Sequence, residues 1–225
     1  MKVLVLNGSP KQQSDTMQLT NAFLVGLNHD AQAEIEIINV IDKEIKPCRG
    51  CFGCWSHGDG KCVISDDQNE ILAKYVEADI VIWSFPLYCF GLPSHLKAVL
   101  DRIIPLVKMD MVEHDGEVHH VCLVDISKKK TVIICGCGFP NSEGNFEGVR
   151  ITCNKCFPNP TMIFVPETPM MNIPAAKPLA DIKRAQFVQA GKEYFAQGSL
   201  TEATIRTLES LMISNEEYIR NINGC

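Results

Sequence analysis

The sequence predicts an α/β protein built on a doubly wound, five-stranded parallel sheet. Five short apolar runs alternate with amphipathic helical patterns along the 225 residues. Four of the runs are apolar almost throughout, which is typical of parallel strands covered on both faces. A third observation is the absence of any repeat, low-complexity tract or Gly/Ser-rich linker. We therefore expect a single domain over residues 1–225.

The strands are predicted at residues 3–7, 35–40, 80–85, 131–136 and 161–165. The second run, EIEIINV, begins with alternating charged and apolar residues, so it suits an edge strand with one exposed face. A helical pattern lies between most pairs of strands, which implies right-handed crossovers and helices on both faces of the sheet.

The first two helices follow the first two strands. The first has apolar or small residues at helical spacing, namely Leu19, Ala22, Phe23, Gly26 and Leu27. The second is predicted over 66–78 and is expected to begin with a capping box formed by Ser65 and Gln68.

The later helices are predicted at 93–104, 146–158, 181–197 and 201–220. Pro93 suits the first helical position of the third helix. The apolar stripe of that helix consists of Leu96, Val99, Leu100 and Ile103. The last two helices form a C-terminal region over 181–225.

Two segments do not fit the alternation of strands and helices. One is a cysteine-rich loop over 43–64, directly after the second strand. The other is 105–130, after the third helix, which is predicted to be an inserted hairpin or lid around Asp115 and Gly116.

Composition excludes several classes of protein. A net charge of −6 and a pI of about 5.5 argue against a nucleic-acid partner. No run approaches the roughly 20 apolar residues of a membrane span, and the first run stops at Asn7, too early for a signal peptide. We therefore expect a cytoplasmic protein with no membrane partner. There, eleven cysteines indicate metal binding, catalysis or small apolar side chains rather than disulfides.

The first strand ends in NGSPKQQSDT, residues 7–16, which suits a phosphate group. Gly8 permits a tight turn, and Ser9, Ser14 and Thr16 offer hydroxyls beside the free N–H groups of a helix start. The motif is neither G-x-G-x-x-G nor G-x-x-x-x-G-K-[ST], so a Rossmann dinucleotide site and a P-loop are disfavoured. The alternative is a plain strand-to-helix turn whose serines cap the helix.

The loops after the third and fourth strands suit a flat ring. Pro86, Leu87, Tyr88 and Phe90 place apolar and aromatic side chains at one strand end. The loop GCGFPNSEGNF, residues 136–146, is rich in glycine, so its backbone can approach the polar edge of a ring. Ligands of open α/β sheets bind at the carboxyl ends of the strands. One loop for phosphate and two for a ring together match FMN.

With these three loops the chain resembles the NAD(P)H-dependent FMN reductases and related iron–sulfur flavoproteins of the flavodoxin-like fold. The segments that carry the resemblance are NGSPKQQSDT, PLYCFGLPSHLKAVLDR and CGCGFPNSEG. The resemblance covers roughly residues 1–165 and implies a sheet of strand order 2-1-3-4-5. It implies FMN contacts from Ser9, Lys11, Ser14, Asp15 and Thr16, from Pro86, Leu87, Tyr88, Cys89, Phe90 and Gly91, and from Gly136, Gly138 and Phe139.

Two positions depart from the usual GSPRKNGNT form of the family. Ser14 and Asp15 replace Gly-Asn, and a carboxylate at Asp15 would repel phosphate unless it turned away to cap the helix. Cys89 stands where a bulkier residue is common, which leaves more room beside the ring.

The cysteine-rich loop carries Cys48, Cys51, Cys54 and Cys62 in a C-x2-C-x2-C-x7-C pattern. Such spacing can wrap a cubane cluster, and the iron–sulfur flavoproteins that the chain resembles place a compact motif at this point, which implies a tentative 4Fe–4S site. The alternative is that the cysteines pack as small apolar side chains near Phe52 and Trp55. Zinc usually takes two separated C-x2-C knuckles, so a zinc site is disfavoured. Disulfides are disfavoured because a cytoplasmic protein keeps its thiols reduced.

Other clusters carry less weight. His114, Asp115, His119 and His120 could bind a metal, although exposed or substrate-facing histidines are favoured, and His57 could replace one cysteine ligand. Lys97 and Asp101 are expected to form a surface ion pair. The C-x2-C of Cys153 and Cys156 on a helix is given no function. No Ser-His-Asp order and no paired carboxylates indicate hydrolysis, and the phosphate loop lacks the cysteine and arginine of a phosphatase.

The resemblance implies an FMN-dependent oxidoreductase that passes electrons from NAD(P)H to a small acceptor such as a flavin, quinone or azo compound. No general acid or base is assigned, because the flavin carries the chemistry. Tyr88, Phe90 and Phe139 are predicted to line the acceptor pocket, shaped by loops 48–62 and 105–130, in a homodimer or homotetramer. The alternatives are an iron–sulfur flavoprotein that carries electrons between proteins, and a binding module without flavin.

Overall fold

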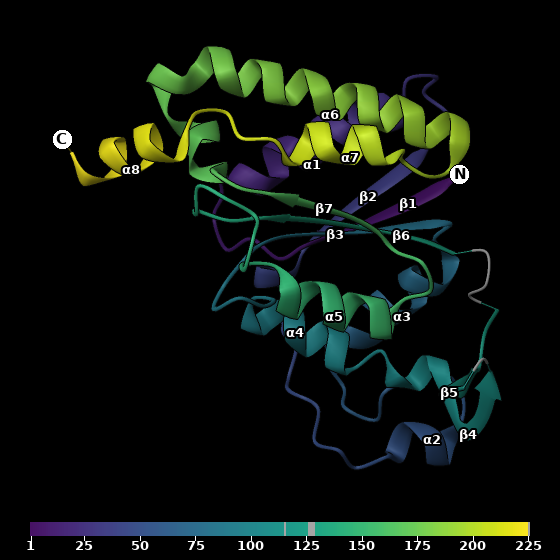
Figure 1. The fold of residues 1–225 in the computed structure, drawn as a ribbon. Coiled ribbons are helices and arrows are strands. Elements are labelled where there is room, and N and C mark those ends of the chain that lie inside the picture. The colour runs from purple at the N-terminus through teal and green to yellow at the C-terminus, as the bar shows by residue number, and fades with distance from the viewer. Residues whose placement is uncertain (115, 126–128, 225) are drawn as a thin grey trace.

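The computed structural model describes residues 1–114, 116–125 and 129–224. Five parallel strands form the central sheet in the order β2-β1-β3-β6-β7 (Figure 1). They are β1 (Lys2–Asn7), β2 (Glu34–Asn39), β3 (Ile80–Pro86), β6 (Lys130–Gly136) and β7 (Thr161–Val165). The predicted strands and their order are confirmed. β2 is an edge strand and is largely exposed, as its alternating sequence indicated.

Helices cover both faces of the sheet (Figure 1). One layer consists of α1 (Asp15–Leu27), α6 (Lys177–Gln197) and α7 (Glu202–Glu209). The opposite layer consists of α3 (Gln68–Glu77), α4 (Ser94–Asp101) and α5 (Glu147–Cys156). Each layer buries its own apolar core against the sheet. This is the doubly wound arrangement that alternating strands and helices predicted.

Helices α1 and α6 approach each other closely because glycines face each other at their contact. A Cβ atom on Gly26 would lie 1.9 Å from the carbonyl oxygen of Val188, and one on Gly191 would lie 2.0 Å from that of Phe23. Real Cβ atoms do not approach backbone so closely, so both positions require glycine for this packing.

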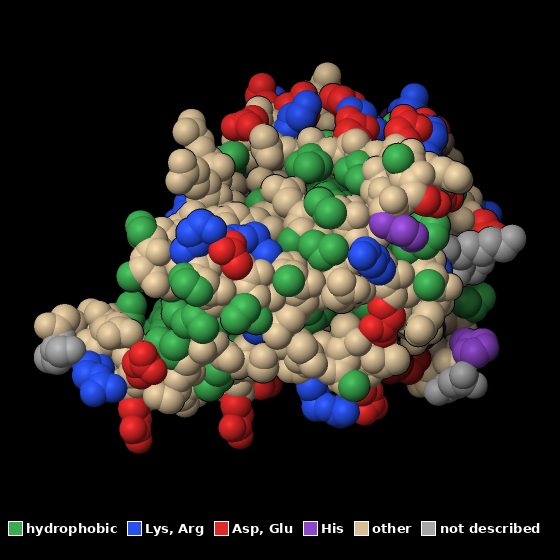
Figure 2. Space-filling model, turned by 90° about the horizontal axis from the view of Figure 1, so that it is seen from above, with side chains coloured by type: hydrophobic (Ala, Val, Ile, Leu, Met, Phe, Trp, Pro, Cys, Tyr) green, Lys and Arg blue, Asp and Glu red, His purple; other side chains and the backbone are tan. Residues whose placement is uncertain are grey.

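The outer surface of the α6 layer carries charges of both signs among scattered apolar side chains (Figure 2). On α6, Asp181 pairs with Lys177 at 2.7 Å and with Arg184 at 2.5 Å. Such exposed pairs at i, i+3 and i, i+4 are typical of a solvent-facing helix. No helix in the described ranges is long and apolar enough to span a membrane.

The start of α3 differs from the prediction. The helix begins at Gln68, its N-cap residue is Asp67, and no capping box forms at Ser65. The Gln68 side chain instead turns inward, where its amide donates to the carbonyl oxygens of Val99 (3.2 Å) and Arg102 (3.1 Å). A buried tertiary contact therefore replaces the local one. Helix α4 also ends early, at Asp101, and Pro93 is its N-cap residue.

The predicted helix 201–220 is wrong, because the chain breaks it into α7 and α8 (Asn215–Asn223). The hydroxyl of Ser214 accepts from the N–H of Glu217 and so starts a new helix. The intervening segment is held by Lys183, whose ammonium donates to the carbonyl oxygens of Leu208 (3.2 Å) and Ser210 (2.7 Å). As Figure 1 shows, α8 extends outward from the body of the fold.

The two irregular segments form a small lobe on the α4 side of the molecule (Figure 1). It contains α2 (Gly53–His57) and an antiparallel pair, β4 (Val107–His114) with β5 (Glu117–Cys122). The predicted hairpin is therefore present, although Asp115 at its turn lies outside the described residues. Short 3₁₀ helices lie at Val40–Asp42, Ile104–Leu106, Thr168–Asn172 and Pro174–Ala176.

Candidate functional site

A pocket lies where the carboxyl ends of the parallel strands meet. The register pairs Asn7 with Ser84 and Pro86 with Gly136, so the loops that follow these strands converge. The pocket contains about 450 Å³ of space, part of it open to solvent. Its lining consists of Ser9, Lys11, Ser14, Asp15, Thr16, Pro86, Leu87, Tyr88, Gly136, Cys137, Gly138, Thr168 and Pro169. Most of the residues that sequence analysis selected are thus brought together.

The loop after β1 forms one end of this pocket. It is fixed from within, since the N–H of Ser9 donates to the Asn7 side chain at 2.9 Å. The hydroxyl of Ser14 accepts from the N–H of Met17 at 3.1 Å and so caps α1. The first N–H groups of a helix have no intrahelical acceptor. Those of Asp15 and Thr16 therefore remain available to an anion at this positive helix end.

Asp15 does not cap the helix, which was the condition under which the sequence allowed it near a phosphate. Its carboxylate accepts from the ammonium of Lys11 at 2.9 Å and from the amide of Asn172. Asn172 also donates to the carbonyl oxygen of Gln13, at 3.1 Å. The negative charge is thus balanced by Lys11 and drawn toward Asn172. The repulsion that an anion would meet at Asp15 is reduced accordingly.

The loop after β3 forms a tight turn at the mouth of the pocket. Tyr88 and Gly91 exchange two backbone hydrogen bonds of 3.0 Å. Between them, Cys89 and Phe90 have φ angles of 47° and 60°, a left-handed conformation that non-glycine residues rarely adopt. Such strain is most often found at functional sites. It directs Phe90 outward, where its side chain is 53% exposed.

Two aromatic rings at the mouth lie against each other. The rings of Phe90 and Phe139 are stacked, with centroids 5.9 Å apart. Both are about half exposed, as is Tyr88. Four of the predicted contacts, Cys89, Phe90, Gly91 and Phe139, lie outside the enclosed lining. The two phenylalanines are therefore placed to contact a ligand that projects from the pocket rather than one inside it.

Sequence analysis missed the wall that follows β7. Thr168 donates its backbone N–H (2.9 Å) and its hydroxyl (3.0 Å) to the carbonyl oxygen of Cys137. A Cβ atom on Gly136 would lie 2.5 Å from a methyl carbon of Thr168 and 2.9 Å from the hydroxyl of Thr16. The segment PETP directly after the fifth strand was the signal, because every strand of a parallel sheet ends at this edge.

The C-terminal segment supports the loop after β6. The hydroxyl of Tyr218 in α8 donates to the carbonyl oxygen of Gly138 at 2.9 Å. Glu167 is fully buried and accepts from the N–H of Met212 at 2.5 Å. Burial raises the pKa of Glu167, against the effect of backbone N–H donors that lower it. The chain beyond α7 is therefore part of the structure that fixes this loop.

A second pocket gathers the four cysteines of the cysteine-rich loop. It contains about 400 Å³ and is lined by Cys48, Cys51, Cys54 and Cys62 together with Arg49, Gly50, Phe52, Val63, Ile64, Arg102, Ile104 and Pro105. Cys48 and Cys51 are exposed and Cys54 is buried. Burial raises the pKa of the Cys54 thiol. Exposed thiols do not fit the interpretation that all four cysteines pack as small apolar side chains.

The donor set of this pocket fits a cubane cluster better than a single ion. No group of three or more His, Cys, Asp or Glu side chains is already arranged to hold one metal ion among the described residues. A mononuclear zinc site needs its sulfurs around one point, each about 2.3 Å from the metal. A cubane binds each thiolate at a separate iron, so four cysteines lining one pocket suit it.

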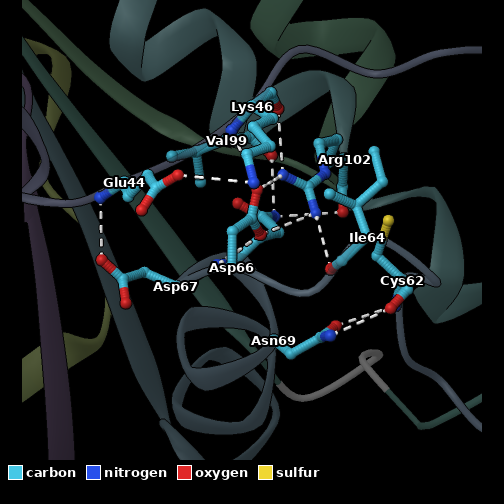
Figure 3. Close-up of polar contacts among 10 residues, drawn as sticks. Glu44, Lys46, Cys62, Ile64, Asp66, Asp67, Asn69, Val99 and Arg102 are labelled. Atoms are coloured by element: carbon cyan, nitrogen blue, oxygen red, sulfur yellow. Dashed lines mark hydrogen bonds and ion pairs between the residues drawn. The ribbon is translucent and has the colours of Figure 1, made fainter.

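The cysteine-rich loop is fastened to the body by a buried ion pair (Figure 3). Arg102 donates to both carboxylate oxygens of Asp66, at 2.6 and 2.9 Å, and the two side chains are 1% and 0% exposed. Arg102 also donates to the carbonyl oxygen of Lys46 at 2.9 Å. Asn69 exchanges two hydrogen bonds with the backbone of Cys62, at 2.8 and 2.9 Å. Both ends of the loop are thus fixed.

Within the chain, the loops 48–62 and 105–130 do not line the first pocket. That they shape the acceptor pocket across a dimer interface stays a prediction. They contact each other instead, because the indole N–H of Trp55 donates to the carbonyl oxygen of Val107 at 2.9 Å. Trp55 also stacks on Phe52 with centroids 5.1 Å apart and lies 5.2 Å from the ring of His120. The aromatic residues that follow the cysteines therefore pack against the hairpin.

The remaining candidates have ordinary surroundings. His119 is exposed, 3.6 Å from Glu117, and His57 is exposed as well. The expected surface pair of Lys97 and Asp101 is confirmed. Cys153 is buried against the sheet, where burial raises its pKa to about 12.

A family model described as NADPH-dependent FMN reductase matches residues 1–140, more than half of the chain. The chain belongs to this family. Family membership and the parallel sheet together confirm the flavodoxin-like fold that the three loops implied.

Curated relatives carry two kinds of name. An iron–sulfur flavoprotein of Methanocaldococcus jannaschii is 41% identical over 106 residues, which cover 47% of this chain and 53% of that protein. An FMN-dependent NADH:quinone oxidoreductase of Pseudomonas fluorescens is 29% identical over 113 residues, which cover 46% of this chain and 56% of that protein. The chain thus spans about half the length of the curated relatives that it matches.

Solved structures share the fold. An FMN-dependent NADH-azoreductase of Bacillus anthracis, in complex with FMN, aligns with a TM-score of 0.62 at 16% identity, covering 87% of this chain and all of that one. An NAD(P)H:quinone oxidoreductase of Methanothermobacter marburgensis aligns with a TM-score of 0.59 at 18% identity, covering 86% and 96%. At such identities the likeness establishes the fold alone.

Proposed function

We propose that the protein is an FMN-dependent oxidoreductase that passes electrons from NAD(P)H to a small acceptor. The observation that carries this proposal is the pocket at the carboxyl edge of the sheet. It joins an anion-binding helix start at Ser14 to apolar walls at Pro86 and Leu87, within one cavity of suitable size. The family of the chain and the names of its relatives support the same activity.

Each wall of the pocket has a separate task in this proposal. The hydroxyls of Ser9 and Ser14 and the N–H groups at the start of α1 would hold the phosphate. Pro86, Leu87 and Tyr88 would contact the ring face, and the backbone of Gly136 and Gly138 its edge. When bound, FMN supplies hydride acceptance from a nicotinamide and onward transfer of the electrons.

The neutral pocket groups also matter for this chemistry. Burial raises the pKa of the Cys137 thiol, so this side chain stays protonated at neutral pH. No described side chain in the lining combines a raised or lowered pKa with the position of a general acid or base. The chain's contribution is therefore binding, orientation and exclusion of water.

A spectrum of the purified protein tests this proposal. We expect flavin absorbance after incubation with FMN and removal of the excess, and its bleaching by NADH or NADPH without oxygen. A quinone or azo dye should restore the absorbance. A protein that stays colourless after incubation with FMN would exclude the proposal and favour a binding module without flavin.

A second function is favoured by the four-cysteine pocket. We propose that it holds a 4Fe–4S cluster through Cys48, Cys51, Cys54 and Cys62, as the iron–sulfur flavoprotein names of several relatives suggest. The protein would then carry electrons between partners. Anaerobic reconstitution should give about four iron atoms per chain. Iron without any oxidation of NADH or NADPH would favour the carrier, and no iron would exclude the cluster.

We also propose a cytoplasmic homodimer or homotetramer. The described cysteines are all free thiols, which agrees with a reducing compartment. The exposed rings of Tyr88, Phe90 and Phe139 would be covered by a second subunit. Light scattering during gel filtration would distinguish these assemblies from a monomer.

A further inference from the structure

Arg102 is a buried cation in the wall of the four-cysteine pocket. Its side chain is 1% exposed and its residue lines that pocket. The terminal nitrogens donate to Asp66 and to the carbonyl oxygens of Lys46 and Ile64, at 2.9 and 3.5 Å respectively. Figure 3 shows these bonds converging on one end of the guanidinium.

The remaining donor of Arg102 has no partner. Its Nε–H finds no acceptor with hydrogen-bond geometry anywhere in the described ranges. Buried donors in native proteins are almost always paired, so a fully buried N–H without a partner indicates an acceptor that completes the site. The Cys62 side chain is near the Arg102 side chain (Figure 3).

The Arg102 pKa reflects the same neighbourhood. Burial alone would lower it, but hydrogen bonding to Asp66, together with the nearby Cys62 sulfur, outweighs burial, and the pKa is raised. Asp66 supplies only one negative charge to the Arg102 guanidinium. A thiolate-bound cluster carries the negative charge that suits an additional buried donor.

We propose that Arg102 is a positioning residue of the iron–sulfur site, whose Nε–H donates to the Sγ atom of Cys62 when that thiolate ligates the cluster. The inference rests on the cluster proposed above. Hydrogen bonds to the cluster sulfurs raise the reduction potential, because one-electron reduction makes the site more negative. Arg102 would therefore make the cluster easier to reduce.

Arg49 provides a matched control. It lines the same pocket, but it is exposed, so water screens its charge. Arg102→Lys keeps the positive charge and removes the Nε–H, and Arg49→Lys makes the same change at the surface. A purely structural role for Arg102 would change stability but not the potential of the cluster.

The experiment is spectroelectrochemistry of anaerobically reconstituted wild type, Arg102→Lys and Arg49→Lys, with iron content and FMN content measured on each sample. We expect equal iron in all three, a cluster potential shifted to more negative values in Arg102→Lys alone, and an unchanged FMN potential. Equal potentials in all three would overturn the proposal, although the cluster itself would stand. No iron in the wild type would remove the cluster and this proposal together, whereas FMN-dependent oxidation of NADH or NADPH would be unaffected.

A second measurement needs no substitution at Arg102 and decides the question if Arg102→Lys fails to fold or to keep iron. Arg49→Lys protein is labelled with ¹⁵N-arginine, and its reduced cluster is examined by pulsed EPR. A ¹⁵N hyperfine coupling is expected, because the hydrogen-bonded Nε is the arginine nitrogen nearest to the cluster. The absence of such a coupling would overturn the proposal.

Discussion

Asp66→Ala should destabilise the protein while leaving the first pocket intact. The substitution removes the carboxylate that pairs with Arg102 and leaves a guanidinium that is 1% exposed without a counter-charge. Removing one partner of a buried pair costs about 3–5 kcal/mol. The N–H groups of Lys46 and Gln68 also lose their acceptor, but Lys46 is exposed and water can replace it. We therefore expect a loss of about 4 kcal/mol in the free energy of unfolding.

Urea unfolding at pH 7 measures this loss, and the midpoint should fall by about 1–2 M. Arg102 holds the pKa of Asp66 below its usual value of 3.8 despite burial, which alone would raise it. The stability that Asp66 contributes is therefore fully present above pH 3.8 and is lost as the pH falls through the lower folded-state pKa.

A double mutant makes the reasoning refutable. Asp66→Ala combined with Arg102→Met removes both charges, so the double mutant should be more stable than Asp66→Ala alone by about 1–2 kcal/mol. The affinity for FMN should equal that of the wild type in folded Asp66→Ala, because none of these residues lines the first pocket. A loss under about 1 kcal/mol in Asp66→Ala, or exactly additive losses in the double mutant, would refute the account.

Three further outcomes follow from the first pocket and its supports. Gly136→Ala should weaken FMN binding at least tenfold, because its Cβ atom would lie 2.5 Å from a methyl carbon of Thr168. Gly138→Ala should bind FMN normally, because its Cβ atom would lie no closer than 3.6 Å to another residue, Pro169. Fluorescence titration with FMN compares the two variants. Ser14→Ala and Ser214→Ala each remove a helix cap and should cost about 1 kcal/mol in thermal or urea unfolding, but FMN titration should show weaker binding only for Ser14→Ala. Burial lowers the pKa of Lys183 to about 8, so between pH 8 and 10.5 the unfolded chain binds more protons than the folded chain and stability rises with pH. Lys183→Met should flatten that rise in urea unfolding. An unchanged dependence of stability on pH would contradict this assignment to Lys183.

The sheet could be predicted because its signals are local. Continuous apolar runs such as 80–85 identify buried parallel strands, and the loops after them identify the edge where a ligand binds. The loop 7–16 could be selected as a candidate phosphate site because hydroxyls at Ser9 and Ser14 stand directly before a helix, and the structure places that loop in the wall of the first pocket. The wall at Thr168 was missed because the segment after the fifth strand carries no phosphate or ring motif, although its strand ends at the same edge of the sheet.

The errors arose where distant contacts override local patterns. Ser65 and Gln68 form a capping box by sequence, but the Gln68 amide bonds to carbonyl oxygens of residues 31 and 34 positions away. Residues 201–220 have helical periodicity, but Lys183 and Glu167 bind the backbone around residue 210 and interrupt it. The buried partner of Asp66 could not be predicted either, because nothing in a pattern pairs it with Arg102.

Helix α1 joins a close packing contact with α6 to the loop after β1, which lines the first pocket. Its carboxyl-terminal end packs against α6 at Gly26 and Gly191, where there is no room for a side chain. Gly26 is eleven positions after Asp15, so this contact lies about 16 Å along the helix axis from the pocket. A methyl group added at Gly26 would meet the backbone of α6, so we expect α1 to shift and its start beside the pocket to shift with it. Variants that impair phosphate binding should therefore be sought on the back of the molecule, at positions that no ligand reaches.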